Sequence, residues 1–128
     1  MSITNLRSII VDGNAEVTVK QAEVLGRDLA RQLTTNQIRN IFGTVRRIEM
    51  NWPENASEEQ ARRAQRELLL LKPKMAYQAK RERGQGVQTL VNVLTDAIDL
   101  VGKDRTRFQY FVDFFEAILA YHKAHGGN

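Results

Sequence analysis

The segment Gln32–Glu49, which reads QLTTNQIRNIFGTVRRIE, constrains the fold more than any other part of the chain. Thr34 and Gln37 stand at its start with the spacing of a capping box, which predicts the beginning of a helix. Apolar residues then recur at the spacing of one helical face. They are Ile38, Ile41, Phe42, Val45 and Ile48. The segment therefore predicts an amphipathic helix that buries one side against a core.

Arginines occupy the other side of this predicted helix. Arg39 and Arg46 are seven residues apart and so lie nearly in line, and Arg47 follows directly. A charged helix face is most often an ordinary solvated surface. It is also a face that can bind an anionic partner, and the spacing alone does not choose between these two interpretations.

Helical periodicity continues through most of the chain. Hydroxyl and carboxyl residues typical of helix N-caps precede several of the apolar patterns. These predicted caps are Thr18, Thr34, Ser57 and Asp104. Apolar residues also recur helically over 87–101, where Gly102 closes the helix. No alternating β-branched run indicates a strand. We therefore predict an all-α fold, a compact bundle of five or six helices.

We expect residues 18–128 to form this helical domain and residues 1–17 to form a flexible N-terminal arm. Ile9–Val11 is short and apolar, and it is interpreted as a strand or a tether. Pro73 must either kink its helix or start a new one, because it lacks an N–H and crowds the preceding turn. Gly26 either allows a close helix crossing or is simply tolerated.

Two segments carry more apolar residues than one helix face needs. Leu68–Leu71 spreads leucines around the whole circumference of a helix, which predicts burial on all sides, either in a deeply central helix or by contact with a partner. Phe114 and Tyr121 lie on a second apolar face of the last helix, which is therefore either central or shared with a partner. These surfaces predict self-association of the isolated protein as a homodimer, with exchange of helices between copies. Trp52, the sole tryptophan, is interpreted as closing the end of the core rather than stacking on a base.

Positive charge is concentrated in the middle of the sequence. The formal net charge of the chain is +4. Residues 31–83 contain 12 lysines and arginines against 6 acidic residues, whereas each flank is slightly acidic. A basic middle between near-neutral ends suggests a surface that binds a polyanion.

The sequence lacks the usual motifs of catalysis. Cysteine is absent, so no thiolate can act as a nucleophile or a zinc ligand. His122 and His125 have no carboxylate at ligand spacing and are interpreted as part of a fraying helix end. Gly84 and Gly86 do not complete a phosphate-binding loop. We predict no catalytic residue, no metal and no cofactor. With no signal peptide or membrane span in view, we expect a soluble cytoplasmic protein.

Two segments, LTTNQIRNIFGTVRRIE (residues 33–49) and LLLLKPKMAYQAKR (residues 68–81), resemble the landmarks of a known family. This is the small-subunit family of type III-A CRISPR effector (Csm) complexes, and the resemblance extends roughly from Val19 to Tyr121. It implies a non-catalytic RNA-binding subunit of an antiviral complex. Its copies would line up along the guide–target RNA duplex. The implied partners are crRNA, target RNA, the large polymerase-like subunit, the crRNA-binding backbone subunit and further copies of this chain.

The resemblance and the basic middle together nominate eight nucleic-acid-binding residues. They are Arg39, Arg46, Arg47, Lys72, Lys74, Lys80, Arg81 and Arg83. Arg62 and Arg63 are weaker candidates. Basic residues interleaved with Tyr77 on one helix face suit a phosphate backbone with occasional base stacking. The alternative function is that of a helical protein-interaction adaptor, whose basic face is incidental and whose surfaces are Leu68–Leu71 and Phe114–Tyr121.

Overall fold

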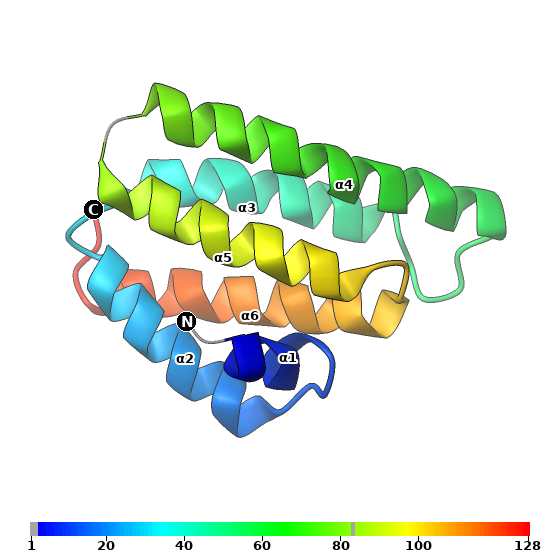
Figure 1. The fold of residues 1–128 in the computed structure, drawn as a ribbon, viewed down its shortest axis with the longest axis horizontal. Helices are drawn as coiled ribbons and strands as arrows, with labels where there is room; N and C mark the ends of the chain where they lie inside the picture. Colours follow the sequence, from blue (N-terminus) through cyan, green and yellow to red (C-terminus); the bar gives the residue numbers. More distant parts are fainter. Residues whose placement is uncertain (1–2, 83) are drawn as a thin grey trace.

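A computed structural model describes residues 3–82 and 84–128 of the chain (Figure 1). This part contains six α-helices and no strand, which confirms the predicted all-α bundle. The helices are α1 (Ile3–Ile10), α2 (Ala15–Leu29), α3 (Thr35–Met50), α4 (Glu58–Arg81), α5 (Gln85–Val101) and α6 (Arg105–Ala124). None of these helices combines the length and the apolarity that a membrane span requires.

Helices α3, α4, α5 and α6 form a ring in which each packs against two neighbours. Both α4 and α6 pack against α3 and α5, so α4 and α6 occupy opposite corners of the ring. Helix α2 lies along α6 in the most extensive helix–helix contact of the fold, and α1 packs against α2, α5 and α6 (Figure 1). Helix α4 is therefore on the side of the ring opposite α1 and α2.

Aromatic side chains from α6 fill the centre of the core. The fully buried ones are Phe108, Phe111, Phe114 and Phe115. Trp52, which follows α3, is only 2% exposed, and its ring stacks on Phe108 with the centroids 5.0 Å apart. The Nε–H of Arg105 donates a hydrogen bond to the Trp52 carbonyl oxygen at 2.6 Å. The interpretation of Trp52 as a core residue is confirmed.

Three of the four predicted N-caps are confirmed, and one is wrong. At Thr34 both bonds of the capping box are present: the Gln37 N–H donates to the Thr34 hydroxyl, and the Thr34 N–H donates to the Gln37 side chain. Ser57 and Asp104 also accept the expected bonds. Helix α2, however, starts one turn before Thr18, because the Asn14 side chain already accepts from the Val17 N–H at 3.1 Å. The Thr18 hydroxyl instead donates to the Asn14 carbonyl oxygen, a bond that fits inside a helix.

The N-terminal residues differ from the predicted strand or tether. Residues Ile3–Ile10 form a helix, α1, with Leu6, Ile9 and Ile10 buried. These three residues are spaced i, i+3 and i+4, which is helical spacing in a segment too short for the pattern to stand out. Burial of this face against α2, α5 and α6 holds the segment in place where its sequence alone would not.

Helix α4 is one continuous helix that includes Pro73, so no new helix starts there. Of the two interpretations of the leucine turn, the deeply central helix is wrong: Leu68 and Leu71 are buried, but Leu69 is 58% and Leu70 43% exposed. Contact of the other two leucines with a partner stays a prediction. Because α4 forms a corner of the ring, only one side of it meets the core. The second aromatic face of α6 does not need a partner chain either, since Phe114 is fully buried in a helix that α1 and α2 cover.

Gly26 marks the closest approach of α2 to α6. A Cβ atom at this position would lie 2.7 Å from the Tyr121 Cβ and 2.9 Å from both the Ile118 carbonyl oxygen and the His122 amide nitrogen. These neighbours are backbone atoms or are fixed to the backbone, so they cannot rotate away. Of the two interpretations of Gly26, the structure supports the close helix crossing.

The C-terminal residues fold back over His122 rather than fraying. The His122 ring is fully buried, and its Nε2 lies 2.6 Å from the Leu33 carbonyl oxygen. Gly127 lies against the other side of this ring, and its carbonyl oxygen accepts a bond from the Thr35 hydroxyl. The Thr35 N–H, at the start of α3, donates to the Asn128 carbonyl oxygen. This segment therefore joins the end of α6 to the beginning of α3.

Substitution of Gly127 tests this contact. A Cβ at position 127 would lie 2.1 Å from the His122 Cε1, so Gly127→Ala must displace either the segment or the ring. We expect a loss of about 1 kcal/mol of unfolding free energy, at the low end for an overpacked site because the segment is short. Chemical denaturation measures the unfolding free energy, and substitution of the exposed Lys123 by alanine is the control. A stability equal to that of the control would contradict the contact.

Candidate nucleic-acid interface

The C-terminal half of α4 carries a compact group of exposed cations around one exposed aromatic ring. Lys74, Tyr77 and Arg81 follow one another at helical spacing, and Lys80 lies beside them. Tyr77 is 66% exposed, and the Arg81 guanidinium lies 5.6 Å from the centre of its ring. None of these three cations forms an ion pair with a carboxylate in the described part of the chain. We name Lys74, Tyr77, Lys80 and Arg81 the α4 basic cluster.

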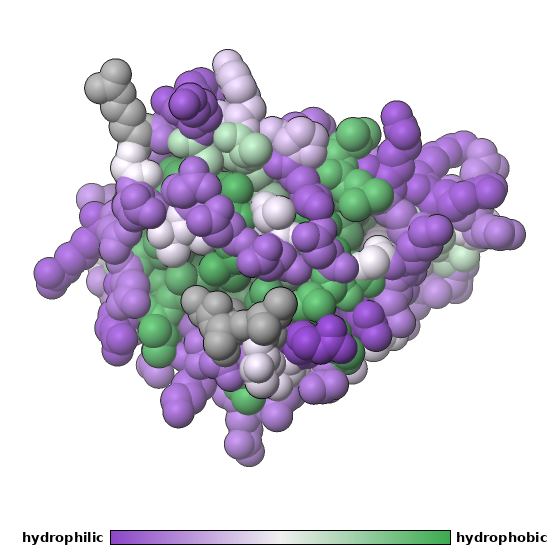
Figure 2. Space-filling model, in the orientation of Figure 1, coloured by the Kyte–Doolittle hydropathy of each residue, from purple (hydrophilic) through white to green (hydrophobic). Residues whose placement is uncertain are grey.

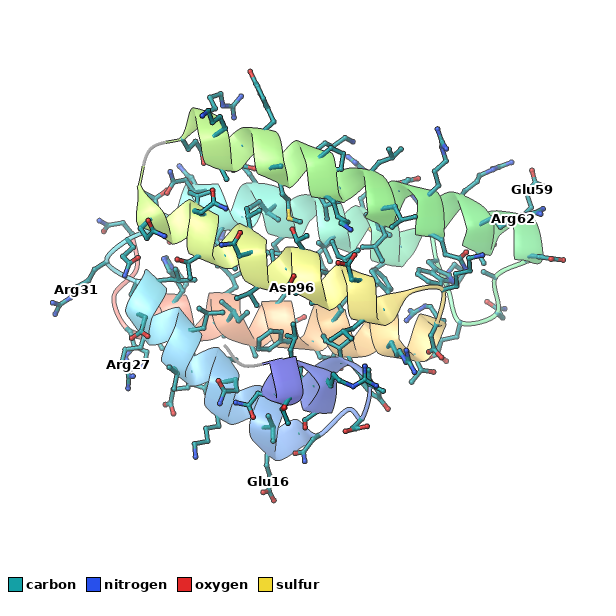
Figure 3. All side chains as sticks on the ribbon, viewed as in Figure 1. Glu16, Arg27, Arg31, Glu59, Arg62 and Asp96 are labelled. Atoms are coloured by element: carbon teal, nitrogen blue, oxygen red, sulfur yellow. The ribbon has the colours of Figure 1, made fainter. Side chains whose placement is uncertain are left out.

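On the side that faces α5, the cationic surface is mixed with polar groups. Lys72 turns towards α5 and places its Nζ 2.5 Å from an oxygen of Asp99. Lys80 lies at the edge of a groove between α4 and α5. The polar residues that line this groove from α5 are Gln88, Asn92, Thr95 and Asp96, the last of which is labelled in Figure 3. The groove therefore offers amide and hydroxyl groups and one carboxylate beside one lysine.

The three α3 arginines differ in their surroundings. Arg46 pairs with Glu49 at 2.7 Å and with Glu116 of α6 at 3.8 Å. Arg39 and Arg47 are exposed and make no ion pair with a described carboxylate. Exposed ion pairs contribute at most about 1 kcal/mol, so Arg46 could exchange its carboxylates for a phosphate at small cost.

The eight predicted residues do not form one surface. Arg46 turns towards α6, whereas Lys72 turns towards α5, and these two directions are opposite sides of the four-helix ring. The structure brings Lys74, Lys80 and Arg81 together, and it places Arg39, Arg46 and Arg47 on a separate helix. Arg83 lies outside the described residues. Of the two weaker candidates, Arg62 is exposed and forms no ion pair with a described carboxylate, and Arg63 pairs with Glu59 at 2.7 Å.

The chemistry available at these surfaces is that of binding. Among the described residues, no three His, Asp or Glu side chains come together as a metal site would require. The α4 basic cluster offers unpaired donors and a ring face, which suit phosphate oxygens and an unstacked base. Nothing in its geometry pairs a nucleophile with a base.

Two exposed cations were missed by the sequence reasoning. Arg66 lies one turn after Arg62 on α4, and this i, i+4 spacing was a signal that could have identified it. Lys103 follows α5 and reaches the same region of α4 only through the fold. No local pattern in the sequence indicated that Lys103 and α4 meet.

Comparison with known proteins places the chain in a family. The profile of the family described as Csm2 Type III-A matches residues 12–128. No curated protein and no solved structure matches the chain. The matched range contains both segments that carry the resemblance, together with α2 to α6. This protein therefore belongs to the Csm2 family, the small subunits of type III-A Csm complexes.

Proposed function

We propose that this subunit binds the guide–target RNA of its complex through the RNA backbone, without reading sequence and without catalysis. The α4 basic cluster is the observation that carries this proposal, because its cations are exposed, form no ion pair with a described carboxylate and are grouped around Tyr77. Contacts to phosphates and ribose fix position but carry no sequence information. Sequence specificity would then come from base pairing between the two RNA strands.

The shape of RNA fits this mode of binding. An A-form duplex exposes its phosphates and 2′-hydroxyls, whereas its base edges in the deep major groove are out of reach of side chains. Lysine and arginine would hold the phosphates. The amide and hydroxyl groups of Gln88, Asn92 and Thr95 are suited to hydrogen bonds with 2′-hydroxyls. The α3 arginines, on a different helix, would contact a second stretch of RNA or a neighbouring subunit.

The proposal includes the arrangement of partners. In a cytoplasmic antiviral complex, the subunit would lie between the large polymerase-like subunit and the crRNA-binding backbone subunit, next to further copies of itself. Both crRNA and target RNA are proposed ligands. Family membership supports the association with other Csm subunits.

Salt dependence of RNA binding tests the proposal. Each phosphate that is neutralised releases counterions, so the logarithm of the association constant should fall linearly with the logarithm of salt concentration. Neutralising three phosphates gives a slope of about −2 to −3. Fluorescence anisotropy with single-stranded, duplex and scrambled RNA measures it. Affinity that is the same at low and physiological salt would contradict the proposal, and so would a strong preference for one sequence.

The contribution of α3 can be measured separately with Arg46→Glu combined with Arg47→Glu. Both side chains are exposed and lie off the buried Ile38–Ile48 stripe, so we expect the helical fold to remain intact. The melting temperature should fall only slightly, because Arg46 loses its exposed ion pairs with Glu49 and Glu116. RNA affinity should fall, because two attractive charges become repulsive. Circular dichroism and anisotropy give the two readings. A large drop in melting temperature would show that these arginines are structural.

A further inference from the structure

The N-terminal half of the exposed side of α4 differs in kind from the α4 basic cluster. A mainly apolar hollow lies where α4 meets the turn between α5 and α6. The residues that line it are Arg62, Gln65, Arg66, Leu69, Leu70, Gly102 and Lys103. We name this the leucine hollow. The N-terminal end of α4, where Figure 3 labels Arg62, extends beyond the neighbouring helices (Figure 1).

Two leucines in this hollow have no packing partner that covers them. Leu69 and Leu70 are 58% and 43% exposed, although Leu68 and Leu71 on the same turn are buried in the core. Figure 2 shows hydrophobic residues reaching the surface over α4 among hydrophilic ones. Adjacent exposed leucines beside a hollow provide apolar area that a partner side chain can bury.

The rim of the leucine hollow is positively charged. Arg62, Arg66 and Lys103 are exposed, and no acidic residue is among the lining residues. None of these three cations forms an ion pair with a carboxylate in the described part of the chain. Elsewhere on the surface, Arg46, Arg63 and Lys72 each have a carboxylate partner. The rim thus complements a partner that supplies carboxylates.

The apolar part of the hollow distinguishes a protein partner from RNA. Successive bases stack on aromatic rings, and the exposed aromatic ring of α4 is Tyr77, in the other half of the helix, whereas the lining of the leucine hollow contains no aromatic residue. Leucine side chains instead pack against apolar side chains, as at the centres of protein–protein interfaces. An apolar centre within a charged rim is the arrangement found at such interfaces.

We propose that the leucine hollow docks an acidic segment of a protein partner. The segment places a bulky apolar side chain against Leu69 and Leu70 and presents carboxylates to Arg62, Arg66 and Lys103. This inference does not depend on RNA binding by the α4 basic cluster. It assigns two different ligands to the two halves of one helix.

Photo-crosslinking identifies what covers the leucine hollow. Leu70 is replaced by p-benzoylphenylalanine in the chain, the Csm complex is purified with it, and the crosslinked peptides are sequenced by mass spectrometry after irradiation. We expect a crosslink to a protein segment with aspartate or glutamate next to an apolar residue. A crosslink to RNA, to a second copy of this chain or to a basic segment would overturn the proposal, and so would the absence of any crosslink.

Paired variants measure the contribution of the hollow to assembly. Leu69→Ser with Leu70→Ser should increase the dissociation constant of the chain from the complex about tenfold or more, because the substitutions remove the apolar area that the partner would bury. Arg62→Glu with Arg66→Glu should act in the same direction. The comparison variant is Lys74→Glu with Lys80→Glu on the same helix, which should lower RNA affinity, whereas the leucine variant should leave RNA affinity unchanged. Native mass spectrometry follows dissociation, and anisotropy follows RNA binding. The proposal is overturned if the leucine variant stays bound like the wild type, or if it loses RNA affinity instead.

Discussion

Gly26→Ala should lower the melting temperature of this protein by roughly 5–10 °C, the drop that about 2 kcal/mol gives in a domain of this size. The added methyl group would collide with backbone atoms of α6 at Ile118 and His122 and with the Tyr121 Cβ. To accommodate it, α2 must move away from α6, and this contact is the most extensive one between helices in the fold. The packing free energy lost when α2 separates from α6 exceeds the stabilisation that the higher helix propensity of alanine provides.

Gly43→Ala is the matched control for this substitution. Gly43 also lies within a helix, but it is exposed, and a Cβ there would meet no atom within 4 Å. Without a clash, only the propensity gain remains, and stability should rise by about 0.5–1 kcal/mol. Thermal denaturation followed by circular dichroism compares the two variants. If both glycines respond in the same direction, the close crossing of α2 and α6 does not control stability.

RNA affinity should fall at least about tenfold in the variant Lys74→Glu with Arg81→Glu, and the salt slope should become shallower by about 2. Both residues belong to the α4 basic cluster and lie on one exposed face, so the fold should be unaffected. The reversed charges would repel the phosphates that Lys74 and Arg81 are proposed to hold. Anisotropy titrations over a range of salt concentrations give both the affinity and the slope.

The control variant for this experiment changes the net charge equally at another place. Lys20→Glu with Lys123→Glu reverses two exposed lysines, on α2 and near the end of α6. A general effect of net charge would weaken RNA binding in both variants to the same degree. The proposed interface requires a clear difference between them, with the control close to the wild type.

The sequence predicted the helices well where helical signals are local. The capping box at Thr34, the cap at Ser57 and the apolar stripe of α3 depend on residues a few positions apart, and all three are present in the structure. Helix α1 was missed because its stability comes from burial of Ile9 and Ile10 against distant helices, which no local pattern reports.

Burial around a helix was less predictable than the helix itself. Four consecutive leucines indicated either a deeply central helix or contact with a partner, and the location of α4 at a corner of the ring, which leaves Leu69 and Leu70 exposed, rules out the first. The second aromatic face of α6 indicated either a central helix or one shared with a partner, and the structure supports the first, because Phe114 is fully buried and α6 packs against α1, α2, α3 and α5. Burial at both places depends on how the six helices are arranged around one another, which is a property of the whole chain.

The candidate site shows the same division between local and long-range information. Spacing along α4 correctly placed Lys74, Tyr77 and Arg81 on one exposed face. It could not show that Lys72 turns to Asp99 on one side of the ring while Arg46 turns to Glu116 on the opposite side. A basic middle segment in the sequence thus became several separate cationic surfaces after folding.

The stacking of Trp52 on Phe108 gives the protein an internal optical probe. Trp52 is the sole tryptophan and is almost completely buried, so its emission reports the packing of the end of α3 against α6. The α4 basic cluster and the leucine hollow contain no tryptophan. The fluorescence emission of the indole should therefore change when each variant unfolds, and it should be nearly insensitive to ligands that bind on α4. Folding and RNA binding can then be measured in one sample of unlabelled protein. Indole emission reports folding, and a visible dye on the RNA reports binding at a second wavelength.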